Sequence, residues 1–91
     1  MIHVNDNPHY TESFLVPNYE DGTYAKALVG GERFWIKDVK PSEDGEIGVY
    51  VGVIDNDLCF EDVHGLACND VVSFKPEGLR YSSQSAKDVM P

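Results

Sequence analysis

The sequence predicts a mainly β domain: a small, strongly curved antiparallel sheet or a partly open barrel, with at most one short N-terminal helix, so that an α+β arrangement stays open. Four segments are rich in β-branched and aromatic residues, turn residues separate them, and the 91-residue chain has the size of one domain. Because so small a domain buries little surface, its aromatic side chains must supply much of the core. The candidates are Phe14, Phe34, Trp35, Tyr50, Phe60 and Phe74.

Residues 5–22 fit two structures. Asn7 followed by Pro8 resembles a helix N-cap and first-turn pair, and Tyr10 and Phe14 would then share one helix face. The competing interpretation takes the later part of this segment, S-F-L-V, as an additional strand. We favour the short helix.

Strands are predicted at 23–29, 33–39, 47–54 and 70–75. Gly30-Gly31 separates the first two strands, and paired glycines suit a tight hairpin because they adopt positive φ angles readily. The link at 40–46 is a second turn, with Pro41 and Gly45 as its turn residues.

The strand predicted at 47–54 is apolar on both faces, which is typical of a central strand or of a small barrel. Its alternating residues are Val49, Val51 and Val53 on one face and Tyr50 and Ile54 on the other. Gly52 has no side chain to pack, so it indicates strong bending or the close approach of another backbone or of Trp35.

The domain is expected to span residues 1–81, with 82–91 as a flexible C-terminal tail, because S-S-Q-S-A-K-D has no periodic apolar residues. The N-terminus has no basic region followed by an apolar stretch, and no apolar run reaches membrane-spanning length. We therefore expect a cytoplasmic protein that does not enter a membrane.

The formal net charge is −9, from sixteen acidic and seven basic side chains, and the sequence pI is about 4.5. The basic residues are scattered among acids rather than clustered, so direct binding of nucleic acid is not expected. An acidic field of this kind favours encounter with basic protein partners and also keeps a small protein soluble.

Both cysteines and one histidine fall between residues 54 and 70, in the spacing C-x4-H-x3-C. Cys59, His64 and Cys68 are weak metal candidates, because a structural zinc site needs four ligands and His3 or His9 would have to supply the fourth. We expect instead two reduced thiols that pack as small apolar residues, a solvated His64 in a turn, and no cofactor.

The same stretch carries the carboxylates of Asp55, Asp57, Glu61 and Asp62. A calcium loop needs a glycine at its centre, and Leu58-Cys59 stands there instead. The acids are better explained as two turns around a short apolar segment at 58–63. The candidate partner-binding residues are Asp55, Asp57, Glu61 and Asp62, with Trp35 and Tyr50 as neighbouring aromatics.

Three segments, G-E-R-F-W-I at 31–36, G-V-I-D-N-D at 52–57 and G-L-A-C-N-D-V-V-S-F at 65–74, together resemble a family of small uncharacterised bacterial proteins, the domain of unknown function 2314 type. The resemblance covers residues 31–75. It implies a compact, mostly β domain and no established chemistry, so no catalytic residue is carried over. Trp35, Gly52, Asn56 and Asp70 match the family pattern, whereas Asn69 replaces its usual glycine.

The function expected from the sequence is a non-enzymatic interaction module that binds a protein partner through an acidic turn or a sheet edge. One alternative is a phage or mobile-element inhibitor that mimics nucleic acid against a DNA- or RNA-binding defence enzyme. The other is a metal-dependent hydrolytic enzyme built on His64, a cysteine and nearby acids, and it has the least support because no nucleophile or base has a distinctive setting.

Overall fold

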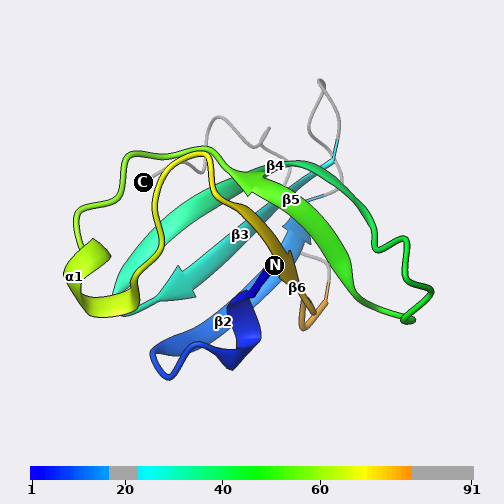
Figure 1. Cartoon of the computed structure of the whole chain (residues 1–91), viewed down its shortest axis with the longest axis horizontal. Helices are drawn as coiled ribbons and strands as arrows, with labels where there is room; N and C mark the ends of the chain where they lie inside the picture. Colours follow the sequence, from blue (N-terminus) through cyan, green and yellow to red (C-terminus); the bar gives the residue numbers. More distant parts are fainter. Residues whose placement is uncertain (17–22, 79–91) are drawn as a thin grey trace.

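The computed structural model describes residues 1–16 and 23–78, which form one six-stranded sheet curled into a half-barrel (Figure 1). The elements are β1 (Ile2–His3), the 3-10 helix η1 (Val4–Asp6), β2 (Tyr10–Val16), β3 (Tyr24–Val29), β4 (Glu32–Pro41), β5 (Tyr50–Ile54), the α-helix α1 (Glu61–His64) and β6 (Val71–Phe74). The predicted fold class, a mainly β domain with a small curved sheet, is confirmed. No helix among the described residues has the length and apolar character needed to cross a bilayer.

The strand order is β1-β6-β5-β4-β3-β2, and all neighbours are antiparallel except β1 and β6, which are parallel. The chain after β6 runs on to the outer edge of β2. There the Glu77 amide donates to the Ser13 carbonyl at 2.8 Å, and the Leu15 amide donates to the Gly78 carbonyl at 2.9 Å. The two sides of the curled sheet are therefore joined by backbone hydrogen bonds.

A β-bulge interrupts β4, and bulges bend a strand and increase its twist. The register between β4 and β5 shifts between Lys37 and Lys40, and Asp38 takes a positive φ of 55°. Gly52 of β5 lies against this bulge, where a Cβ atom would be 2.8 Å from the Lys37 carbonyl oxygen. The close approach predicted at Gly52 is thus made by β4, through the Ile36 side chain and the Lys37 backbone, and only glycine fits there without a shift.

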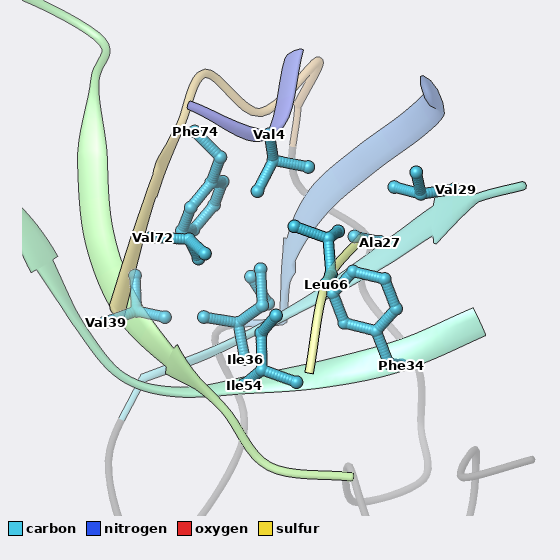
Figure 2. Packing of buried hydrophobic residues seen from close by; sticks show 11 residues of the cluster. Val4, Ala27, Val29, Phe34, Ile36, Val39, Ile54, Leu66, Val72 and Phe74 are labelled. Atoms are coloured by element: carbon cyan, nitrogen blue, oxygen red, sulfur yellow. The ribbon is translucent and has the colours of Figure 1, made fainter. Parts of the chain in front are cut away.

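The apolar core fills the concave side of the half-barrel (Figure 2). Alternate residues of β3 to β6 point into it, as the period of two in a strand requires. Val4 of η1 and Leu66, which follows α1, add to the core from outside the main strands, and both are fully buried or nearly so. The core residues are Val4, Ala25, Ala27, Val29, Phe34, Ile36, Val39, Ile54, Leu66, Val72 and Phe74.

The favoured N-terminal helix is wrong, and the competing strand is present as β2. Asn7 is not the N-cap of a helix: its side-chain oxygen accepts the His9 amide at 3.0 Å, and its side-chain amide donates to the His64 carbonyl at 2.7 Å. Ser13 then points to the buried side while Phe14 pairs across the outer face with β3. Tertiary pairing overrides the local capping signal, because six of the seven residues of β2 find ladder partners on β3.

The four predicted strands are present with shifted ends. The largest shift is in β5, which begins at Tyr50 because residues 43–48 form a loop and leave Ile47 94% exposed. The paired positive φ angles of Gly30 and Gly31 confirm the predicted hairpin between β3 and β4. The predicted boundary between domain and tail, after residue 81, lies outside the described residues.

Candidate functional site: the acidic corner

The segment that leaves β5 folds back through the single turn of α1 at one end of the half-barrel (Figure 1). The His64 amide donates to the Phe60 carbonyl at 3.1 Å, and the Gly65 amide donates to the Glu61 carbonyl at 2.8 Å. Gly65 then ends the helix in the left-handed conformation, with φ of 74°, which glycine adopts at little cost. Such a short helix is stable only if other parts of the protein hold it.

Glu32, the first residue of β4, holds this segment against the hairpin. Its carboxylate accepts the backbone amides of Cys59 at 2.6 Å and Phe60 at 3.0 Å, and it lies 2.9 Å from the His64 Nε2 atom. Burial by itself would raise the pKa of Glu32, but the hydrogen bonds from Cys59, His64 and Phe60 outweigh it and hold the pKa below its ordinary value. Glu32 is therefore an ionised carboxylate whose hydrogen-bond partners are Cys59, Phe60 and His64.

His64 is not the solvated turn residue that we expected. Its side chain is 0% exposed, and its Nδ1 atom accepts the Leu66 amide at 3.0 Å while Nε2 donates to Glu32. The ring packs beside the Gly30 turn and lies 6.4 Å from the Phe34 ring. The expectation failed because the buried partner, Glu32, is thirty-two residues away in the sequence.

Asp55 and Asn56 hold the start of the segment on β4. The Asp55 amide donates to the Trp35 carbonyl at 2.9 Å, and the Trp35 amide donates to the Asn56 side-chain oxygen at 2.5 Å. The Asp55 carboxylate also lies 3.6 Å from the Lys37 ammonium group. Asn56 thus continues the sheet with a side-chain acceptor at the point where β5 stops.

Three carboxylates remain on the surface of this held segment: Asp57, Glu61 and Asp62 are exposed. Among the described residues, none of the three forms an ion pair. Two large apolar side chains are exposed beside them, Phe60 at 43% and Val63 at 45%. We call the surface made by Asp57, Phe60, Glu61, Asp62 and Val63 the acidic corner.

Phe60 and Val63 were not predicted as site residues, and Phe60 was wrongly predicted as a core residue. The signal that could have found them is their spacing. Two apolar residues three positions apart, with acids between them, share one face of a helical turn, and a helix this short has its other face against the protein. The outward face therefore combines apolar and acidic side chains.

The two aromatic residues predicted beside the acids lie elsewhere. Tyr50 starts β5, at the other end of that strand from Asp55, and its ring packs 6.3 Å from Phe74. Trp35 is only 2% exposed and belongs to a second apolar cluster on the outer face of the sheet, with Val16. The structure therefore does not bring Trp35 or Tyr50 to the surface of the acidic corner.

Trp35 lies under a buried lysine. The Lys26 ammonium group is 4.4 Å from the centroid of the Trp35 ring, in a cation–π contact, and Tyr24 meets the same ring edge-on at 6.0 Å. Burial, and then the charge of Arg33, lower the pKa of Lys26 to about 8. Within the described part of the chain, the Trp35 Nε1 atom is buried without a hydrogen-bond acceptor.

The thiols and the histidine do not form a metal site. Both cysteines are free, but Cys59 is exposed and Cys68 is half-buried, so neither is the buried apolar residue that we expected. Both ring nitrogens of His64 are occupied by Glu32 and Leu66. In residues 1–16 and 23–78, no three side chains of His, Cys, Asp or Glu are grouped to hold a metal ion.

Comparison of the chain with protein-family models, with curated proteins and with solved structures finds no match. The acidic corner is therefore interpreted from its own geometry.

Proposed function

We propose that this protein is a non-enzymatic interaction module whose acidic corner binds a basic segment of another protein. The observation that carries the proposal is the exposure of Phe60 and Val63, at 43% and 45%, between exposed carboxylates that form no ion pair within residues 1–16 and 23–78, on a segment that contacts with Glu32 hold in place. Exposed apolar side chains ringed by charge are typical of binding surfaces. Charge complementarity then selects a partner rich in Arg or Lys.

Preorganisation favours the acidic corner over the second acidic region, the loop at 43–48. That loop also exposes an apolar residue, Ile47, next to Glu43 and Glu46. The side-chain contacts of that loop are short-range: the Ser42 hydroxyl donates to Asp44 at 2.9 Å, and the Lys40 ammonium group lies 3.9 Å from Glu43. A surface that is already ordered loses less conformational entropy when it binds.

Strand addition at a sheet edge has less support than the acidic corner. The outer edge of β2 already pairs with Glu77 and Gly78 at Ser13 and Leu15. The outer edge of β1 is only two residues long. A partner strand would therefore find few free backbone groups to pair with at these places.

The experiment measures binding of a fluorescent amphipathic peptide that alternates Arg with Leu, by fluorescence anisotropy at several salt concentrations. The test variant is Glu61→Lys with Asp62→Lys, and the control is Glu43→Lys with Glu46→Lys. Each substitution adds 2 to the charge, so both double variants change the net charge from −9 to −5 and place the added charge in different surface regions. We expect the test variant to weaken binding about tenfold more than the control, with wild-type binding that falls as salt rises.

A second pair of variants measures how much the exposed apolar side chains contribute to peptide binding, separately from the charges. Phe60→Ser removes the exposed ring from the acidic corner, and Ile47→Ser removes an exposed apolar side chain from the other loop. We expect only Phe60→Ser to weaken binding, by about 1 to 2 kcal/mol. Equal effects of the two charge variants, or of the two serine variants, would mean that binding is not located at the acidic corner.

The net charge of −9 and the exposed carboxylates at both the acidic corner and the 43–48 loop also favour a second candidate, an inhibitor that presents carboxylates in place of phosphates. Its test is competition with duplex DNA for a DNA-binding nuclease. Displacement of the DNA would support the mimic, and unchanged DNA binding at excess protein would rule it out. The resemblance to the domain of unknown function remains a proposal and adds no chemistry to either candidate.

A further inference from the structure

The His64 imidazole joins the segment that carries the acidic corner to the core. On one side its Nε2 atom donates to Glu32 at 2.9 Å, and on the other its Nδ1 atom accepts the Leu66 amide at 3.0 Å. Leu66 is a core residue that is 1% exposed. The side-chain amide of Asn7 also donates to the His64 backbone carbonyl at 2.7 Å, so β-sheet, core and N-terminal segment all meet at this residue.

The geometry assigns the neutral form to this ring. An amide N–H needs an acceptor, so Nδ1 must be unprotonated, and the proton on Nε2 then points to the Glu32 carboxylate. The charged imidazolium has donors on both nitrogens. Its Nδ1–H would face the Leu66 N–H at 3.0 Å, and these two donors cannot bond to each other.

The charged groups around the ring determine which contact breaks on protonation. Among the described residues, Glu32 of β4 is the charged group that contacts the ring, and its negative charge attracts an imidazolium. The other elements that meet His64 offer uncharged groups: the Phe34 ring, the Gly30 turn, the Asn7 amide and Leu66. On α1 itself, Glu61 and Asp62 are exposed to solvent. The Glu32 contact therefore survives protonation, and the Leu66 contact does not.

We propose that the Glu32–His64 pair is a protonation-sensitive latch: when the His64 imidazole becomes charged, it gives up the Leu66 amide and loosens the C-terminal end of α1, which carries Val63 of the acidic corner. The loosening follows from the protein's own geometry. That it weakens partner binding rests on the proposed function. Protonation of His64 would then reduce binding of the partner without any change in the residues that form the acidic corner.

The first experiment follows the free protein by NMR between about pH 7.5 and about pH 5.5, the range in which histidine ordinarily titrates. The ring nitrogen shifts report protonation of Nδ1, and hydrogen exchange reports protection of the Leu66 amide. We expect the ring nitrogen shifts and the Leu66 exchange to change with the same pH midpoint. Protection of the Leu66 amide should fall about tenfold beyond the intrinsic effect of pH on exchange, and protection of the Ala27 amide of β3 should not change. Protonation of Nδ1 with full Leu66 protection, or a ring that stays neutral until the whole protein unfolds, would overturn the latch.

Two variants make the test specific. In His64→Asn the side-chain oxygen can still accept the amide two residues ahead, as in an Asx turn, but it cannot titrate. Leu66 protection should then lose its dependence on pH. His9→Asn removes an exposed imidazole and should behave as wild type. If Leu66 protection still depends on pH in His64→Asn, another titrating group causes that dependence.

The second experiment measures binding of the same Arg–Leu peptide, whose charge does not change in this pH range. Binding to wild type should weaken by about fivefold at the lower pH, and binding to His64→Asn should not. An equal loss in both proteins would overturn the link between the latch and the corner. If the peptide binds at no pH while Leu66 still loses protection, the proposed function fails and the latch stands.

Discussion

The most informative substitution is Glu32→Gln, which keeps the size of the β4 side chain that holds the segment carrying the acidic corner. The glutamine oxygen can still accept the Phe60 amide and the His64 Nε2–H, as the Oε1 atom of Glu32 does. Its NH2 group then replaces the Oε2 atom that accepts the Cys59 amide at 2.6 Å. One hydrogen bond is lost, and two change from charge-assisted to neutral.

The expected loss of stability follows from these three contacts. A hydrogen bond to a charged group contributes about 1.5 to 3 kcal/mol, and a neutral one contributes about 0.5 to 1.5 kcal/mol. Because Cys59 and Phe60 are exposed, water replaces part of what is lost at their amides. We therefore expect the free energy of unfolding to fall by about 2 kcal/mol, or the melting temperature by about 10 °C in a domain of this size.

Urea denaturation near neutral pH measures this change, with Glu43→Gln as the control. Glu43 is 89% exposed and lies 3.9 Å from Lys40, so its loss should change the stability by about 0.5 kcal/mol or less. A Glu32→Gln protein as stable as the control would show that the three contacts contribute nothing net, and the acidic corner would lose its main anchor.

The same carboxylate predicts a dependence on pH. The pKa of Glu32 is lower in the folded protein than the ordinary 4.5 expected after unfolding. Its ionised form therefore stabilises the fold above about pH 4.5, and this contribution is lost as the pH falls through the lower, folded-state pKa. Wild type should lose stability in that acidic range more steeply than Glu32→Gln, and parallel stability curves for the two proteins would contradict this.

Three further substitutions or reactions test other parts of the structure. Gly52→Ala places a Cβ atom 2.8 Å from the Lys37 carbonyl oxygen, so we expect a loss of about 3 kcal/mol in urea denaturation, and a change below about 1 kcal/mol would show that the bulge moves easily. Asn56→Ala leaves the Trp35 amide without its acceptor, so thermal denaturation should show a loss of about 1 to 2 kcal/mol. Cys59, which is exposed, should react with a thiol reagent in the folded protein faster than half-buried Cys68, and equal rates would contradict the placement of the segment.

The sequence by itself determined the features that depend on local chemistry. The period of two in the apolar residues and the paired glycines specify strands and a hairpin without any knowledge of their partners, because strand geometry and positive φ angles are properties of a few consecutive residues. Gly52 in an apolar strand was enough to predict either strong bending or the close approach of another backbone or of Trp35, and the approach of β4 is one of these alternatives. Asn69 takes the left-handed conformation, with φ of 70°, that asparagine tolerates better than most residues.

The tertiary structure alone decided everything that joins distant residues. Asn7 and Pro8 have the local signature of a helix start, yet pairing with β3 makes the residues that follow a strand. His64 looked like an exposed turn residue, yet Glu32 and Leu66 bury it. Phe60 looked like a core residue, yet it lies on the surface because Glu32 holds its amide there. Local sequence carries no information about a partner thirty residues away, and the free energy of such contacts exceeds the small local preferences that it does encode.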